Sequence, residues 1–183
     1  MSSSRLLVAV QAGLLLSLAH SPLQAQAFPA PERRPYGAFA FQDSVEVPLP
    51  PDQAFDRFLE VDEWWDHRFS PDPKAFYIEA RPGGGFYEIF DESGDGLRHA
   101  TVIAVSRGSL LRLQGPLGLT GYALDGVYSI SFRPRDSGTL VHLDARGAGE
   151  MEQGWDRAIQ RVWHHFLVER FKPYTEGVLE KEG

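Results

Sequence analysis

A glutamate and a histidine on two predicted neighbouring strands are the side chains best suited to do chemistry. Segments 86–91 and 97–106 have the composition of strands, and Ser93-Gly94 between them is typical of a tight turn. Such a turn places Glu88 directly opposite His99, on an otherwise apolar face. The other residues expected on this face are Phe86, Phe90, Leu97, Thr101, Ile103 and Val105.

A carboxylate and an imidazole paired in apolar surroundings allow three interpretations. The two groups can shift each other's pKa and carry out acid–base chemistry. They can instead hold the polar end of a ligand by hydrogen bonds. They can also form an ion pair whose role is only structural. The sequence leaves the three open.

The other histidines give weaker signals. His142 alternates with apolar neighbours and is expected on the solvent face of its strand. His164 and His165 point about 100° apart on a helix, so they cannot bind one ion from the same face. His165 and Glu169 have the i, i+4 spacing of a metal pair, which is also that of a surface ion pair. Because no third ligand lies nearby in the sequence, we predict no metal site and no cofactor.

Two turns resemble ligand-binding loops but lack the residues that those loops need. Gly83-Gly84-Gly85 leads into a strand and is not followed by the Gly-Lys-Ser/Thr of a phosphate loop. The turn that begins at Asp91 has Val102 where a calcium loop requires glutamate. The chain has no cysteine and no Gly-x-Ser-x-Gly motif, so no activated nucleophile is recognisable.

The element best able to position these residues is a long helix predicted over residues 151–172. Its apolar side chains recur at steps of three and four, which places them on one face. At 1.5 Å per residue this helix is about 33 Å long, enough to cross a small sheet. The apolar face consists of Trp155, Ile159, Val162, Trp163, Phe166, Leu167 and Phe171.

The rest of the chain predicts an antiparallel sheet of about seven strands. The expected strands are 39–47, 76–80, 86–91, 97–106, 110–114, 127–133 and 139–146, with two short helices between the first two. Short turns make successive strands antiparallel neighbours, and only the final helix is long enough to cover one face. We therefore predict an α+β helix-grip fold with a cavity between sheet and helix.

Two segments rich in large apolar side chains are candidates for the cavity entrance. Segment 115–126, which includes Tyr122, is apolar for a loop and either packs over the sheet end or forms a lid. Of Trp64 and Trp65, one ring is expected in the core and the other at the entrance.

The N-terminal residues have the features of an export signal. A basic residue, an apolar stretch too short to span a membrane comfortably and a small-x-small motif at Ala25-Gln26-Ala27 predict a signal peptide over 1–27. An extended arm is then expected over 28–38 and one domain over 39–183. We expect no transmembrane segment in the mature chain and a location in the periplasm or outside the cell. The formal net charge of −7 argues against nucleic-acid binding through a basic surface.

Several stretches resemble the START-like, Bet v 1-like (SRPBCC) superfamily, nearest its Hsp90-ATPase-activator-like and polyketide-cyclase-like branch. The resemblance covers about residues 39–174 and implies a cavity for apolar small molecules. The export signal argues against a co-chaperone of a cytosolic ATPase. The stretches are V-P-L-P-P-D-Q-A-F-D-R-F-L-E-V-D-E-W-W (47–65), P-G-G-G-F-Y-E-I-F (82–90), S-G-T-L-V-H-L-D-A-R-G-A-G (137–149) and the helix start at Gly154-Trp155.

These observations favour an exported protein that binds an apolar or amphipathic small molecule. A cofactor-free enzyme, cyclase-like or hydrolase-like with His99 as base, is the alternative, and a domain whose aromatics fill the cavity is a third. The ligand and the oligomeric state are left open. The predicted ligand-binding residues are Trp65, Phe86, Glu88, Phe90, His99, Thr101, Ile103, Tyr122, Tyr128, Ile130, Trp155, Trp163 and Phe166.

Overall fold

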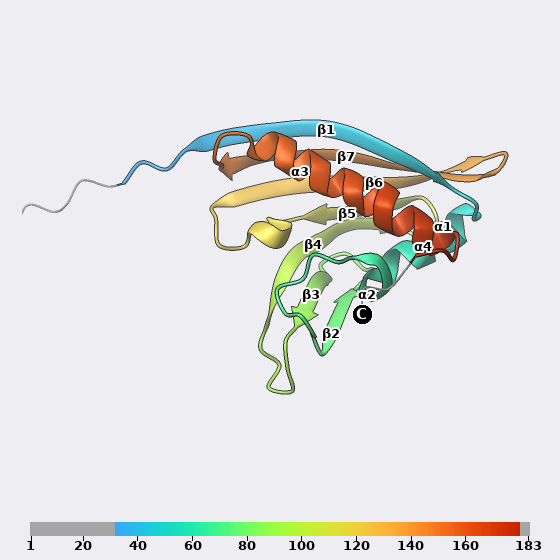
Figure 1. The fold of residues 1–183 in the computed structure, drawn as a ribbon, viewed down its shortest axis with the longest axis horizontal. Coiled ribbons are helices and arrows are strands. Elements are labelled where there is room, and N and C mark those ends of the chain that lie inside the picture. Colours follow the sequence, from blue (N-terminus) through green and yellow to red (C-terminus); the bar gives the residue numbers. More distant parts are fainter. Residues whose placement is uncertain (1–31, 180–183) are drawn as a thin grey trace, which may run out of the picture. The chain divides into compact units, whose positions relative to one another are not determined.

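The described part of the chain, residues 32–179 of a computed structural model, contains one seven-stranded antiparallel sheet (Figure 1). The strand order is β1-β7-β6-β5-β4-β3-β2, so only the pairing of β1 with β7 joins strands that are distant in sequence. The strands are β1 (Tyr36–Val47), β2 (Ala75–Ile78), β3 (Gly85–Ile89), β4 (Gly96–Ser106), β5 (Leu110–Gln114), β6 (Leu124–Arg135) and β7 (Gly138–Glu150).

The helices lie where the sequence predicts them, with different limits. Two short helices, α1 (Pro51–Leu59) and α2 (Val61–Trp64), connect β1 to β2. The C-terminal helix consists of α3 (Trp155–His164), a π-helical segment (His165–Phe171) and α4 (Lys172–Thr175). It crosses the sheet in Figure 1, and the predicted α+β helix-grip fold is confirmed.

The C-terminal helix begins at Trp155 rather than at the predicted residue 151. The preceding strand β7 continues to Glu150, and Gly154 takes a left-handed conformation with φ of 87°. Glycine adopts this conformation without the steric cost that a side chain imposes. The chain therefore turns at Gly154 before it can enter the helix.

Aromatic side chains from the helices form much of the core against the sheet. Trp163, Phe166 and Phe171 are at most 2% exposed, and Phe58 of α1 packs edge-on against Phe132 of β6 and Phe171. Burial of each such side chain contributes about 1.5–3 kcal/mol relative to exposure. This packing holds the C-terminal helix on the sheet along its second half.

Two irregularities in β4 change which of its residues face inward. His99 is an extra residue between the pairs Phe86–Ala100 and Tyr87–Arg98, and Ile103 is an extra residue in the pairing with β5. A bulge of this kind reverses the alternation of side chains along a strand. Ala100 and Val102 are therefore buried, while Thr101 and Ile103 turn to the outer face, where Ile103 is 40% exposed.

Near its turn, the predicted register of the β3–β4 hairpin is wrong by two residues, and beyond the bulge it is wrong by one. Glu88 pairs with Leu97 rather than His99, and Ile89 pairs with Gly96, so the turn is longer than Ser93-Gly94 alone. A shift of two residues keeps Glu88 and His99 on the same face. Glu88 and His99 are diagonal neighbours and still come together.

The strands at the end of the sheet near α3 are longer than predicted. β1 begins at Tyr36, β6 at Leu124, and β7 extends to Glu150. The predicted signal peptide and residues 28–31 of the predicted arm lie outside the described residues. Within residues 32–179, no helix has both the length and the apolar character needed to cross a membrane.

Candidate functional site

A cavity of about 350 Å³ lies between the C-terminal helix and the sheet. This volume is near the lower end of the range typical of small-molecule sites. One wall is the short turn that contains the 3₁₀ helix η1 (Leu117–Leu119). The lining residues are Trp65, His67, His99, Pro116, Leu117, Gly118, Leu119, Tyr128, Trp155, Ala158, Ile159, Val162, Trp163 and Phe166.

Aromatic rings in close contact shape the apolar wall of the cavity. Trp65 stacks on Phe166 with ring centroids 3.8 Å apart and meets Trp163 edge-on at 5.7 Å. Tyr128 lies 5.3 Å from Trp163. Rings in mutual contact have few rotamers to choose from, so this wall is largely preformed.

Six of the predicted ligand-binding residues line the cavity, and the structure brings them together from four parts of the chain. They are Trp65 after α2, His99 on β4, Tyr128 on β6, and Trp155, Trp163 and Phe166 on the C-terminal helix. Of the two adjacent tryptophans, Trp65 reaches the cavity and Trp64 packs in the core, 1% exposed.

The other predicted residues do not line the cavity. Phe86 lies behind the wall, in contact with His99 and Trp65. Tyr122 is 43% exposed and contacts Trp155 at 4.8 Å, and Ile130 is fully buried in the core. Phe90 follows the last residue of β3, and the bulge at His99 turns Thr101 and Ile103 to the outer face. Glu88 lies behind the wall as well, bonded to His99.

Several lining residues were missed by sequence reasoning. Ile159 and Val162 belong to the recognised apolar stripe of the helix, so their signal was present. Residues 116–119 belong to the segment considered as a lid. No sequence pattern pointed to His67, because it reaches the cavity only through the path of the loop after α2.

Glu88 and His99 form a fully buried pair at one end of the cavity. The Glu88 Oε2 and His99 Nε2 atoms are 3.0 Å apart, and the two side chains are at most 1% exposed. The Glu88 carboxylate also accepts the backbone N–H groups of Phe69 at 3.1 Å and Ser70 at 2.6 Å. The predicted contact between Glu88 and His99 is confirmed.

The second ring nitrogen of His99, Nδ1, makes no hydrogen bond of normal length and angle, although the backbone of Leu117 lies close to the ring. Among the described residues, only His99 Nδ1 and Trp64 Nε1 are buried polar side-chain atoms without such a hydrogen bond. The backbone of Leu117 lies near enough to favour the charged form of the ring. Leu117 itself has a φ of 51°, the only positive value at a non-glycine residue described, and such a backbone costs about 1–3 kcal/mol.

The pKa of His99 is lowered by burial, which outweighs the opposing influence of Glu88 and of the Leu117 backbone. A neutral His99 that donates its Nε2 hydrogen to Glu88 carries a lone pair on Nδ1. This nitrogen can accept a hydrogen bond or take up a proton. Burial also raises the pKa of Tyr128, with a smaller contribution from the charge of Asp125, so the phenol remains a neutral donor.

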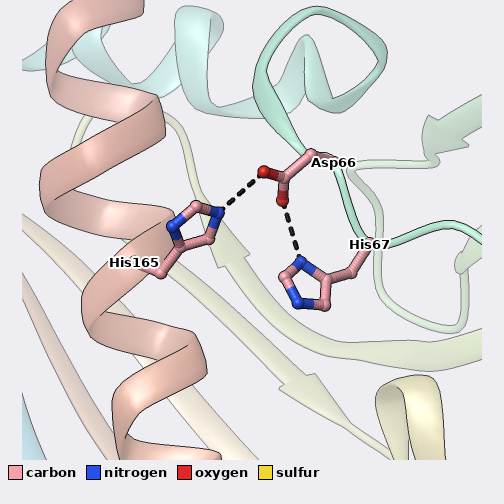
Figure 2. Close-up of side chains that lie close together, drawn as sticks. All are labelled: Asp66, His67 and His165. Carbon is pink, nitrogen blue, oxygen red and sulfur yellow. Dashed lines mark hydrogen bonds and ion pairs between the residues drawn. The ribbon is translucent and has the colours of Figure 1, made fainter. Parts of the chain in front are cut away.

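A second group of polar side chains lies at the cavity edge where His67 lines it (Figure 2). Asp66 Oδ2 is 2.7 Å from His165 Nε2, and Asp66 Oδ1 is 2.8 Å from His67 Nδ1. The Nδ1 atom of His165 is 2.8 Å from Glu169 Oε2. The sequence showed no further ligand near His165 because Asp66 and His67 are far away along the chain.

The two carboxylates beside His165 affect its charge state. Burial alone lowers the pKa of His165, but the hydrogen bonds to Glu169 and Asp66 outweigh burial and raise it. Burial likewise acts to raise the pKa of Asp66, and its hydrogen bonds with the two histidines lower it instead. Arg170 Nε lies 3.3 Å from Asp66 Oδ2.

Comparison with known proteins rests on structure. No protein-family model and no curated protein matches the chain by sequence. An uncharacterised protein from Rhizobium leguminosarum has a similar structure, with a TM-score of 0.59 and 12% identity over 80% of this chain and 99% of its own.

Two further solved structures are similar to this chain. The structure of Ara h 8.0201 has a TM-score of 0.56 and 11% identity, over 77% of this chain and 99% of its own. The di-domain ARO/CYC protein StfQ from the steffimycin biosynthetic pathway has a TM-score of 0.51 and 16% identity, over 76% of this chain and 51% of its own. At such low identity the comparisons concern the fold alone: the chain has the Bet v 1-like, START-like (SRPBCC) fold that its sequence predicted.

Proposed function

We propose that the chain is an exported binding protein for an amphipathic small molecule. The apolar part of the ligand occupies the aromatic cavity, and a hydroxyl or similar donor at its polar end donates a hydrogen bond to His99 Nδ1. The observation that carries this proposal is a buried histidine that lines a mostly apolar cavity and whose Nδ1 atom makes no hydrogen bond of normal geometry, with only the Leu117 backbone close to the ring. Buried polar groups are rarely left without a partner, so an unpaired one requires an explanation.

The turn of residues 116–119 is the expected gate. Its Leu117 is strained and lies beside the same ring nitrogen, and strain of this kind clusters at ligand clamps and switches. A ligand that bonds to Nδ1 would displace the Leu117 backbone and release this strain. Access would therefore depend on a small movement of one turn, with the aromatic wall unchanged.

The direct test compares two probes, a long-chain primary alcohol and its methyl ether. The alcohol should bind more tightly by about fivefold, the value of one hydrogen bond of about 1 kcal/mol. Replacement His99→Phe should remove this preference, and Ala158→Trp, which fills the cavity, should weaken both probes at least tenfold. Calorimetry or probe displacement measures the affinities of the three proteins for the two probes. Equal affinities in the unchanged protein would refute the role of His99, and binding untouched by Ala158→Trp would refute the cavity.

Export is tested separately from ligand binding. If residues 1–27 are a signal peptide, the protein recovered from the periplasmic or culture fraction should begin at Phe28. Intact-mass measurement of the same sample would also reveal a retained ligand as an added mass that organic extraction removes. A chain that keeps residue 1 in these fractions, or is missing from them, would refute export.

A second candidate function is a cofactor-free cyclase-like or hydrolase-like enzyme in the same cavity. The supporting observation is the geometry of a general base: Glu88 orients the imidazole through Nε2 and leaves Nδ1 with a lone pair. Replacement Glu88→Gln would then leave affinity nearly intact but reduce turnover by about 10²–10⁴-fold. Unchanged turnover of a demonstrated substrate in Glu88→Gln and His99→Ala would exclude this mechanism.

A further inference from the structure

We propose that Asp66, His67 and His165 bind a divalent transition-metal ion such as Zn²⁺ at the edge of the cavity. One potential ligand atom from each of the three side chains lies within 4.8 Å of the others (Figure 2). The three residues come from two separate elements, the loop after α2 and the start of the π-helical segment. Their meeting is a product of the fold.

The donor set suits such an ion. Imidazole nitrogens and carboxylate oxygens are common ligands of Zn²⁺, and three protein ligands leave a fourth position for water. The atoms that now face Asp66 are His67 Nδ1 and His165 Nε2. A metal ion between the three groups would replace these two hydrogen bonds with bonds to the ion.

A carboxylate already orients one of the proposed ligands from behind. Glu169 Oε2 lies 2.8 Å from His165 Nδ1, the nitrogen that faces away from Asp66. Histidines that bind metals usually donate their other ring N–H to such a carboxylate, which fixes the tautomer and aims the free lone pair at the ion. This contact makes the group more than an ordinary ion pair between helix and loop.

The backbone of the C-terminal helix changes from α-helical to π-helical geometry at His165. The π-helical segment begins at His165, and short π-helical segments inside α-helices are frequently found at functional sites. Behind it, Phe166 and Leu167 remain buried, while His165 faces the loop. The irregularity therefore coincides with the residue whose position the proposed site requires.

The local charges also accommodate a cation. Asp66 and Glu169 contribute two negative charges, and Arg170, 3.3 Å from Asp66, contributes one positive charge. Arg170 Nε is also 3.3 Å from the Trp64 carbonyl oxygen, so a second acceptor holds it there. One negative charge remains uncompensated when both histidines are neutral. The ion would link the His67 loop to the C-terminal helix and hold the cavity wall that His67 forms.

The experiment uses the untagged full chain after removal of metal ions with a chelator. Titration calorimetry with ZnCl₂ should show one ion per chain, and cobalt binding should produce the visible absorption of a four- or five-coordinate ion. Replacements His67→Ala and His165→Ala should each weaken Zn²⁺ binding at least 100-fold. Replacement Glu169→Gln should weaken it by about 10–100-fold, the usual effect of losing an orienting carboxylate.

The matched control is His164→Ala, on the same helix and bonded to Asp43 instead. It should retain full Zn²⁺ affinity. His67 is exposed, so His67→Ala is expected to fold normally and provides the decisive variant, with near-UV circular dichroism as the check. The proposal is overturned if the unchanged protein shows no saturable site, or if His67→Ala binds as tightly as His164→Ala does.

Discussion

His99 and His165 each lie beside a glutamate, yet their surroundings shift their pKa values in opposite directions. His99 is 1% exposed and has one carboxylate partner, so burial prevails and its pKa is lowered. The side chain of His165 is 28% exposed and has carboxylates at both ring nitrogens, which raise its pKa. The two histidines therefore suit different chemistry. His99 is a neutral hydrogen-bond acceptor inside the cavity, whereas His165 is an imidazole held between two carboxylates at the cavity edge.

The largest difference between the two regions should appear when each glutamate is removed. Replacement Glu88→Ala leaves three donors without their acceptor: the fully buried ring N–H of His99 and the partly buried backbone N–H groups of Phe69 and Ser70. We expect a loss of about 3 kcal/mol in the free energy of unfolding. Replacement Glu169→Ala removes an exposed partner and should cost about 0.5 kcal/mol or less. Urea denaturation measures both losses in the free energy of unfolding, and equal losses would contradict the expected difference between the buried and the exposed glutamate.

The pH dependence of stability should differ in sign between the two histidines. The unfolded chain takes up a proton on His99 near pH 6.5, while the folded chain resists it, so stability falls as the pH drops below 6.5. For His165 the folded pKa is the higher one, so its stabilising contribution is complete below pH 6.5 and is lost as the pH rises through the raised folded pKa.

Two variants separate these contributions in buffers that contain a chelator. His99→Gln should lose less stability than the unchanged protein between pH 6.5 and about 5, the range in which an unperturbed histidine becomes charged. His165→Gln should lack the stability gained on acidification. Thermal or urea denaturation across this range measures how the free energy of unfolding depends on pH. If both replacements changed this dependence in the same direction, burial would not distinguish the two sites.

The smallest expected difference is the response to salt. Double-mutant cycles for Asp66–His165 and Glu88–His99 measure the coupling energy of each pair. One molar salt should reduce the first coupling by about 0.5 kcal/mol, because ions screen partly exposed charges, and should leave the buried pair nearly unchanged. A salt-sensitive Glu88–His99 coupling would mean that solvent reaches the end of the cavity.

Most of the fold prediction rested on the periodic spacing of apolar residues. The apolar stripe of the C-terminal helix and the alternation of apolar and polar residues in the strands follow from local backbone geometry, so they can be predicted from a single sequence. The contact between Glu88 and His99 was also predictable, because a two-residue register error preserves the face of the sheet. Thr101 and Ile103 were misplaced because the bulge at His99 reverses the alternation of β4 ahead of them, and no residue type marks a bulge reliably.

By itself, the sequence determined the fold class, the helix that closes the cavity and six of its lining residues. These depend on short-range patterns and on the total apolar face to be buried. Only the tertiary structure decided that His99 keeps one nitrogen unpaired and that Asp66, His67 and His165 converge. Both outcomes depend on the path of loops whose ends are held by other elements. Asp66 and His165 are about a hundred positions apart, and a contact at that separation produces no periodic pattern in the sequence.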